Sequence, residues 1–215
     1  MNDTIIIFIM EIVGTVAFAV SGSLVAVKGS LDLFGVIFVG CVTAVGGGIS
    51  RDILMGRFPP AIFSNTFFLA IAAVTCVLAF VFSYLRRKSF TDFRRRLEVV
   101  NNFFDAIGLA AFTVTGVESA ITYEFSNYPV FAISAGVLTG IGGGIIRDVL
   151  VDKTPYVLRK HIYALASAIG GCLYFYTRIY LNKTVAVFIS VGIIILIRIL
   201  ATKFHWKLPK VIVEE

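Results

Sequence analysis

Two copies of one short pattern place groups that can bind or repel ions inside otherwise apolar sequence. In each copy three consecutive glycines are followed, after two intervening residues, by an Arg-Asp pair. The first set is Gly46, Gly47, Gly48, Arg51 and Asp52, and the second is Gly142, Gly143, Gly144, Arg147 and Asp148. Each glycine costs a helix about 1 kcal/mol relative to alanine, so a triplet predicts a local break or kink. Main-chain carbonyl oxygens freed there are ligands of the kind that replace a cation's hydration shell in a pore.

Helix packing offers another explanation of these glycines. Small residues recur at every fourth position, as Gly40, Ala44 and Gly48 and again as Gly136, Gly140 and Gly144. Such a stripe lets two membrane helices approach closely. Packing and kinking are compatible, because one glycine face can serve both. A phosphate loop is not indicated, because no Lys-Ser or Lys-Thr pair follows the glycines.

The charged residues beside the triplets need partners or water, because an ion at membrane depth is costly. Adjacent helical residues do not face each other, so we expect each arginine and its neighbouring aspartate to have different partners. Two roles are open for Arg51 and Arg147: locking the bent helices to nearby groups, or gating an ion path. Further polar candidates for the lining of that path are Glu11, Ser21, Thr43, Asp105, Thr115, Glu118 and Thr139. For any single serine or threonine, a hydrogen bond to its own helix is the alternative.

The composition predicts that these residues are held by membrane-spanning helices. Of the 215 residues, 58% are hydrophobic and 15% are charged, against about 45–50% and about 25% in soluble domains. The three cysteines lie in apolar runs without metal-ligand spacing, and the sequence contains no familiar hydrolase motif. We therefore expect no metal site, no cofactor, no catalytic residue and no enzymatic activity. A nucleic-acid partner is also not expected despite the net charge of +6.

Helices of about 20 residues cross the hydrocarbon core, and the sequence predicts seven in a single transmembrane domain, 1–215. The stretches are 4–27, 35–58, 61–85, 103–123, 130–154, 158–180 and 183–204, with a basic linker at 86–102. The fold class is therefore an all-α membrane protein. Most of the 19 lysines and arginines fall on one side if the N-terminus lies outside, which predicts a cytoplasmic C-terminus. Arg198, near the end of the last stretch, is expected to reach the lipid headgroups.

The two patterns belong to a longer internal repeat. Residues 40–59 match 136–155 at 10 of 20 positions, and residues 11–26 match 105–120 at 6 of 16. Helices 1–3 (4–85) and 4–6 (103–180) are thus two copies of one unit, and helix 7 (183–204) is added. Because three crossings are an odd number, the second copy enters from the opposite side, giving an inverted repeat with its site near the midplane.

The doubled motif GGGxxRDxLxxxxP, preceded by Ser21-Gly22 and by DAIGLAAFTVTG at 105–116, resembles the prokaryotic trimeric intracellular cation (TRIC) channels. The same two-copy domain has also been labelled a glycine transporter. The resemblance implies a seven-helix homotrimer with a pore in each protomer, kinked at the glycine triplets of helices 2 and 5. It implies passage of monovalent cations, chiefly potassium with sodium as a further candidate, across a bacterial or archaeal plasma membrane. Expected partners are other copies of the chain and membrane lipids. The alternative is a secondary carrier for glycine or another small amino acid, with Arg51 or Arg147 on the substrate carboxylate.

Overall fold

The computed structural model describes residues 2–86, 90–159, 162–204 and 206, which form helices and no strand. Seven helices are long: α1 (Asn2–Lys28), α2 (Leu33–Leu54), α4 (Phe67–Leu85), α5 (Phe90–Ala120), α6 (Pro129–Leu150), α8 (Ile162–Tyr180) and α9 (Lys183–Lys203). Three elements are short: α3 (Ala61–Ser64), the π-helical segment η1 (Ile121–Phe125) and α7 (Tyr156–Arg159). The all-helical membrane fold class is therefore confirmed.

The predicted element bounds need three corrections. The third stretch, 61–85, is divided into α3 and α4, because Asn65 has an extended conformation with φ of −133°. The sixth, 158–180, begins only at Ile162 as α8, after the separate α7. The fourth helix starts at Phe90, so most of the predicted linker 86–102 is helical, and the side chains of residues 87–96 lie outside the described part.

Six of the described helices are long and apolar enough to cross a membrane, and α8 is not among them. One face of α8 is buried and carries polar groups, including Ser167, Tyr163 and Tyr174. This lowers its hydropathy although its length equals that of α4. Length and composition alone therefore do not confirm the predicted count of seven spans.

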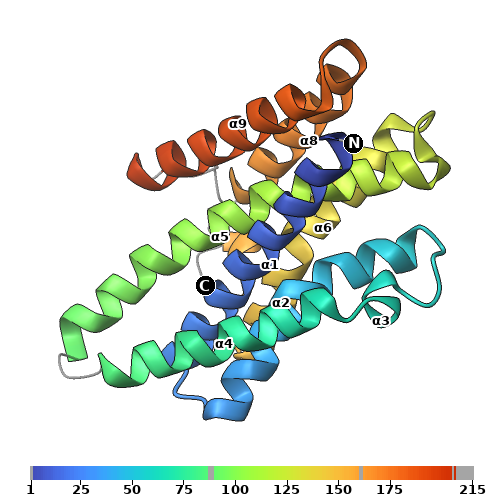
Figure 1. Ribbon diagram of the computed structural model, residues 1–215. Coiled ribbons are helices and arrows are strands. Elements are labelled where there is room, and N and C mark those ends of the chain that lie inside the picture. Colours follow the sequence, from blue (N-terminus) through green and yellow to red (C-terminus); the bar gives the residue numbers. More distant parts are fainter. Residues whose placement is uncertain (1, 87–89, 160–161, 205, 207–215) are drawn as a thin grey trace, which may run out of the picture.

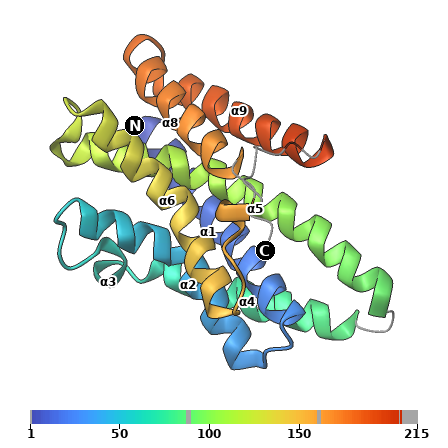
Figure 2. The same cartoon turned by 180° about the vertical axis from the view of Figure 1, so that it is seen from behind.

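Four helices form the centre of the molecule (Figures 1 and 2). Helix α1 packs against α5 and α2, and α6 packs against α5 and α2. Helix α4 covers α1 and α2 on one side, while α8 covers α5 and α6 on the other and α9 lies against α8 and α5. The apolar side chains of α4 are largely exposed in the single chain, as expected for a helix that faces lipid or another copy.

Helices α2 and α6 end in the same way. At the end of α2, the Arg57 amide donates to the Asp52 carbonyl, and the Gly56 amide donates to the Ile53 carbonyl. At the end of α6, the Lys153 amide donates to the Asp148 carbonyl, and the Asp152 amide donates to the Val149 carbonyl. This pair of backbone hydrogen bonds is the Schellman motif, which needs a residue in the left-handed backbone conformation. Gly56 (φ +71°) and Asp152 (φ +53°) supply it 96 positions apart.

The glycine triplets lie where α2 and α6 cross. A Cβ added to Gly47 would meet the carbonyl oxygen of Thr139, and one added to Gly143 would meet that of Thr43. Helical structure continues through both triplets, although the two ribbons change direction along their length (Figures 1 and 2). The expected break in the hydrogen-bond ladder is therefore not seen: the helices bend without a gap. Close packing between the two backbones accounts for the glycines, as the packing interpretation predicted.

Candidate functional site

A buried network centred on Arg147 joins α6 to α1 and α5. One terminal nitrogen of Arg147 donates to Oδ1 of Asp105 at 2.7 Å and to the Ser21 hydroxyl at 2.6 Å. The Ser21 hydroxyl in turn donates to the Asn101 amide oxygen at 2.8 Å. Asp105, Ser21 and Arg147 are at most 3% exposed. Charge-assisted bonds in such a dry place are strong and tie the three central helices together.

Arg198 of α9 joins the same network. Its side chain is buried 3.9 Å from Oδ2 of Asp105, and its guanidinium lies 4.5 Å from the ring centre of Tyr163 and 5.3 Å from that of Tyr156. The expectation that Arg198 reaches the headgroups was wrong. Asp105 offers a nearer counter-charge, and two aromatic faces stabilise the cation.

The adjacent Arg and Asp residues bind each other, contrary to the sequence prediction. The Nε atoms of Arg51 and Arg147 lie 2.9 Å from Oδ1 of Asp52 and Asp148 respectively. The adjacency rule describes Cβ directions, whereas a long arginine side chain can fold back on its neighbour. The other carboxylate oxygens accept the amides of Ala61 and Tyr156, the first residues of α3 and α7, at 2.8 and 2.7 Å. Each aspartate therefore fixes its arginine and the start of the next short helix.

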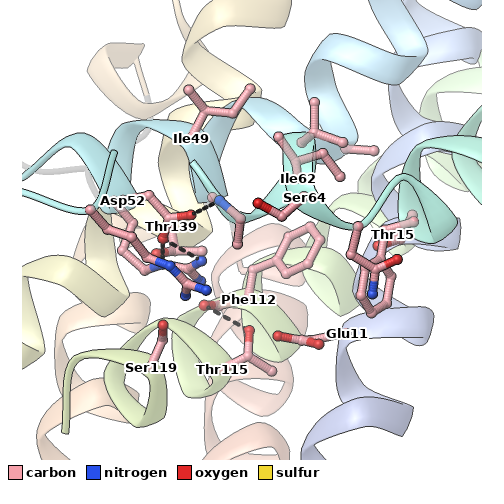
Figure 3. A pocket seen from close by; sticks show the side chains of 18 residues that line it. Glu11, Thr15, Ile49, Asp52, Ile62, Ser64, Phe112, Thr115, Ser119 and Thr139 are labelled. Atoms are coloured by element: carbon pink, nitrogen blue, oxygen red, sulfur yellow. Dashed lines mark hydrogen bonds and ion pairs between the residues drawn. The ribbon is translucent and has the colours of Figure 1, made fainter. Parts of the chain in front are cut away.

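A cavity of about 360 Å³, which we call the Arg51 cavity, opens between α1, α2, α3 and α5 (Figure 3). Its polar lining consists of Glu11, Thr15, Arg51, Asp52, Arg57, Ser64, Asn65, Thr115, Ser119 and Thr139. Within the described part of the chain, the Glu11 carboxylate has no hydrogen bond or ion pair, unlike that of Asp105. The cavity therefore offers an unpaired, half-buried acid and hydroxyl groups to water or an ion.

A second cavity of about 430 Å³, the Arg147 cavity, lies at the opposite ends of α1 and α5. It is lined by Leu24, Val25, Lys28, Leu97, Glu98, Asn101, Asn102, Arg147, Asp148, Lys153, Thr154 and Tyr156. At 1.5 Å per residue, Glu11 in the first cavity and Lys28 in the second are about 25 Å apart along α1. The two Arg-Asp pairs thus stand at opposite ends of the helical centre.

Packed side chains separate the two cavities. Phe18 and Phe112, which correspond in the repeat, contact each other edge to face with ring centres 5.2 Å apart. Thr43 and Thr139 are buried, and both donate to carbonyls of their own helices at 2.6 Å. Together with the Arg147 network these groups lie between the two cavities.

Glu118 lies away from both cavities, unlike the other polar candidates. Its carboxylate pairs with Arg178 at 2.6 Å and Lys183 at 2.8 Å, and accepts the Tyr174 hydroxyl at 2.9 Å. It joins α5 to α8 and α9, which is a structural role. Thr115 borders the Arg51 cavity, and its only hydrogen bond among the described residues is a 3.5 Å contact to its own helix.

Several residues of the site were missed from the sequence alone. The Arg147 network also includes Asn101 and Tyr163. The phenylalanine pair packs between the two cavities, and Arg57 lines the Arg51 cavity. The repeat contained a clue to the phenylalanines, because Phe18 and Phe112 are identical at matching positions. Asn101 and Tyr163 have no such marker, since they come together only through the packing of α5, α6 and α8.

Comparison with known proteins places the chain in a membrane protein family of channel or transporter type. The profile of the family described as "Glycine transporter" matches twice, at residues 8–84 and 102–178. The UPF0126 inner membrane protein YadS of Escherichia coli K12 is 39% identical over 213 residues, covering 98% of both chains. The solved structure of a prokaryotic TRIC channel in 0.5 M KCl is 33% identical with a TM-score of 0.85, covering 95% of this chain and all of the other. The TRIC trimeric intracellular cation channel orthologue from Rhodobacter sphaeroides is 29% identical with a TM-score of 0.83, over 94% and 99%.

The chain therefore belongs to the TRIC channel family, which shares its two-copy domain with the UPF0126 membrane proteins. Its described residues have the fold of the solved TRIC channels. Within that part of the chain, no group of three or more His, Cys, Asp or Glu side chains is placed to hold a metal ion.

Proposed function

We propose that the protein is a channel for monovalent cations, permeable to potassium and also to sodium, with a path inside each protomer. The observation that carries this proposal is the pair of cavities that enter the four-helix centre from opposite ends of α1 and α5. Each has an Arg-Asp pair at its end of the path, as a duplicated pore would require. The likeness to solved TRIC cation channels over almost the whole chain supports it.

The narrowest part of the path is the crossing of α2 and α6 at the glycine triplets, between the two cavities. The Glu11 carboxylate lowers the cost of a cation near one entrance, because it is not paired with an arginine in the described structure, unlike Asp52, Asp105 and Asp148. The threonine hydroxyls border the route. Because no backbone gap is present, the carbonyl oxygens of the triplets become available only if α2 and α6 move apart. The closed packing of the centre fits a channel in its resting state.

The membrane arrangement that goes with this function has seven spans, with α8 as the sixth. Residues 4–85 and 103–180 are the two inverted copies, the linker 86–102 connects them, and 183–204 is the added helix. The matched helix ends, glycine contacts and Arg-Asp pairs support this arrangement. We place the N-terminus outside and the C-terminus in the cytoplasm, in the plasma membrane of a bacterium or archaeon. We further propose a homotrimer in contact with membrane lipids, and the trimeric orthologue from Rhodobacter sphaeroides supports the homotrimer.

A carrier for glycine or another small amino acid is the second candidate. It is favoured by the family profile's description and by the packed centre, which leaves two cavities without an open connection. In a carrier, one cavity would bind the substrate before the other opens. Arg51 would then hold the substrate carboxylate.

Flux into liposomes separates the two functions. Purified protein reconstituted with a potassium gradient should release potassium at a rate that does not saturate at millimolar concentration, and should not concentrate labelled glycine. Saturable glycine uptake without potassium flux would contradict the channel and support the carrier. Protein-free liposomes carried through the same reconstitution are the control.

A further inference from the structure

The two ends of the proposed path carry equivalent residues in different states. The repeat pairs Arg147 with Arg51, Asp105 with Glu11, and Ser21 with Thr115. At one end Arg147 holds both Asp105 and Ser21 within 2.7 Å. At the other end Arg51 has neither equivalent contact among the described residues. The same set of residues is therefore hydrogen-bonded in one copy of the repeat and separate in the other, which indicates two conformations of one arrangement.

Arg51 has the free capacity to make the missing contacts. Its Nε and one terminal nitrogen bind Oδ1 of Asp52 at 2.9 and 2.8 Å. The other terminal nitrogen makes no hydrogen bond within the described residues, whereas Arg147 uses one of its terminal nitrogens for Asp105 and Ser21. Arg51 can therefore keep its bond to Asp52 and still donate from its other terminal nitrogen to a further acceptor.

The expected acceptors face the same cavity. Glu11 and Thr115 line it together with Arg51, and the view of the cavity places both side chains at its edge (Figure 3). The Glu11 carboxylate is unpaired in the described structure, and the Thr115 hydroxyl makes only the 3.5 Å contact to its own helix. Neither group has to give up a strong partner to bind Arg51.

We propose that Arg51, Glu11 and Thr115 form a second latch, equivalent to Arg147, Asp105 and Ser21, that closes the Arg51 cavity by bringing α2 against α1 and α5. The inference rests on the proposed path through the protomer. In this structure the Arg147 latch is closed and the Arg51 latch is open. Conduction requires both latches to be open, so either one alone stops the current.

The test removes one acceptor of the Arg51 latch at a time. Glu11→Gln and Thr115→Ala are compared with Glu124→Gln and Thr75→Ala, which make the same side-chain changes outside the two cavities. Because Glu11 has no partner in the described structure and Thr115 only a weak one, both variants are expected to fold. Protection of a Ser119→Cys probe from a membrane-impermeant thiol reagent reports closure of the Arg51 cavity, in a chain with Cys41, Cys76 and Cys172 changed to alanine.

Loss of a charge-assisted bond should shift the closed–open equilibrium of the cavity about tenfold toward open. Glu11→Gln and Thr115→Ala should therefore each lower the protected fraction of Ser119→Cys and raise open probability, with the tenfold effect for Glu11→Gln, whereas both controls leave them unchanged. The double variant should lose more protection than either single variant, since both residues bind Arg51. Adding Ser21→Ala, which weakens the other latch, should multiply the effect on open probability.

If the thiol reagent modified Ser119→Cys to the same extent in all variants, the proposal of a second latch would be wrong. So would a Glu11→Gln channel with smaller unitary current and unchanged protection, because Glu11 would then only attract ions. The thiol measurement does not require ion conduction, so its result is independent of whether the protein is a channel. Silent bilayers with the predicted protection pattern would refute the channel and leave the latch in place.

Discussion

At the scale of single residues, Asp105 explains how four charges are tolerated in the helical core. Its carboxylate lies 2.7 Å from Arg147 and 3.9 Å from Arg198, while Asp148 holds the other side of Arg147. Two arginines and two aspartates sum to no net charge. A buried network of this kind is stable only while every member keeps its partner. The stability of the network therefore depends on Asp105.

Replacing Asp105 with alanine should destabilise the protein by about 3–5 kcal/mol, because both arginines lose a counter-charge in a dry environment. Unfolding by denaturant in detergent measures this change. The control is Glu98→Gln, which breaks the ion pair between Glu98 and Lys28. The side chains of this pair are 63% exposed for Glu98 and 34% exposed for Lys28. Its loss should therefore cost less than about 1 kcal/mol. Equal stability of the two variants would contradict the network.

The sequence located these charged residues but could not assign their partners. Charge at membrane depth and the repeat were enough to single out Arg51, Arg147 and Asp105. The pairing of Arg147 with Asp148 was missed because the spacing rule ignores how far an arginine side chain can fold back. The place of Arg198 was missed because it depends on how α9 packs against α5 and α8.

At the scale of elements, the glycine triplets show that neighbouring glycines have different roles. Gly47 faces the Thr139 backbone and Gly143 the Thr43 backbone, whereas Gly48 and Gly144 have only side-chain atoms at 3.5 Å or more. Backbone atoms cannot move aside without separating α2 from α6. The crossing thus requires the middle glycine of each triplet most strictly, while a Cβ on Gly142 would still lie 3.3 Å from the Cα atom of Gly47.

Gly47→Ala should cost about 3 kcal/mol or more, since overpacking against backbone is poorly relieved. Gly48→Ala should be tolerated or stabilise by up to about 1 kcal/mol, because alanine is the better helix former. Thermal unfolding of the two variants in the same detergent decides between them. If both lose stability equally, the crossing does not depend on contact at Gly47.

The matched ends of α2 and α6 give a second prediction for the elements. Gly56→Ala should destabilise by about 1 kcal/mol, because its φ of +71° strains any side chain. Asp152→Gly at the equivalent position of α6 should be neutral or stabilising, since glycine adopts φ of +53° without strain. Opposite signs in the unfolding free energy are expected; a loss in both variants would contradict the equivalence of the two caps.

The element pattern was largely predictable, and its errors have local causes. Apolar runs separated by polar or glycine-containing turns defined the long helices. The missed boundaries fall at Asn65, where the chain becomes extended, and at Phe90, where a charged segment is helical without being apolar. The continuous helix through the triplets could not be foreseen, because glycine weakens a helix in isolation while the α2–α6 crossing stabilises it here.

At the scale of the whole molecule, the proposed path consists of two cavities with a packed centre between them. The cavities lie at opposite ends of α1 and α5, and the Arg147 network, the phenylalanine pair and the glycine crossing fill the space between them. The duplicated sequence predicted matching features in the two copies, with the site near the midplane. Which of the two arginines would bind the acid of the first helix in its own copy was not predictable, because both copies carry an arginine and an acid at matching positions.

Single-channel recording of the wild-type protein in planar bilayers tests the central claim most directly. With a potassium salt as the only electrolyte, the account predicts discrete unitary currents that reverse near the potassium equilibrium potential, about 59 mV for a tenfold gradient. It also predicts closures that end abruptly as a latch opens. Bilayers that stay silent with protein known to be inserted, together with saturable glycine uptake by liposomes of the same preparation, would contradict it.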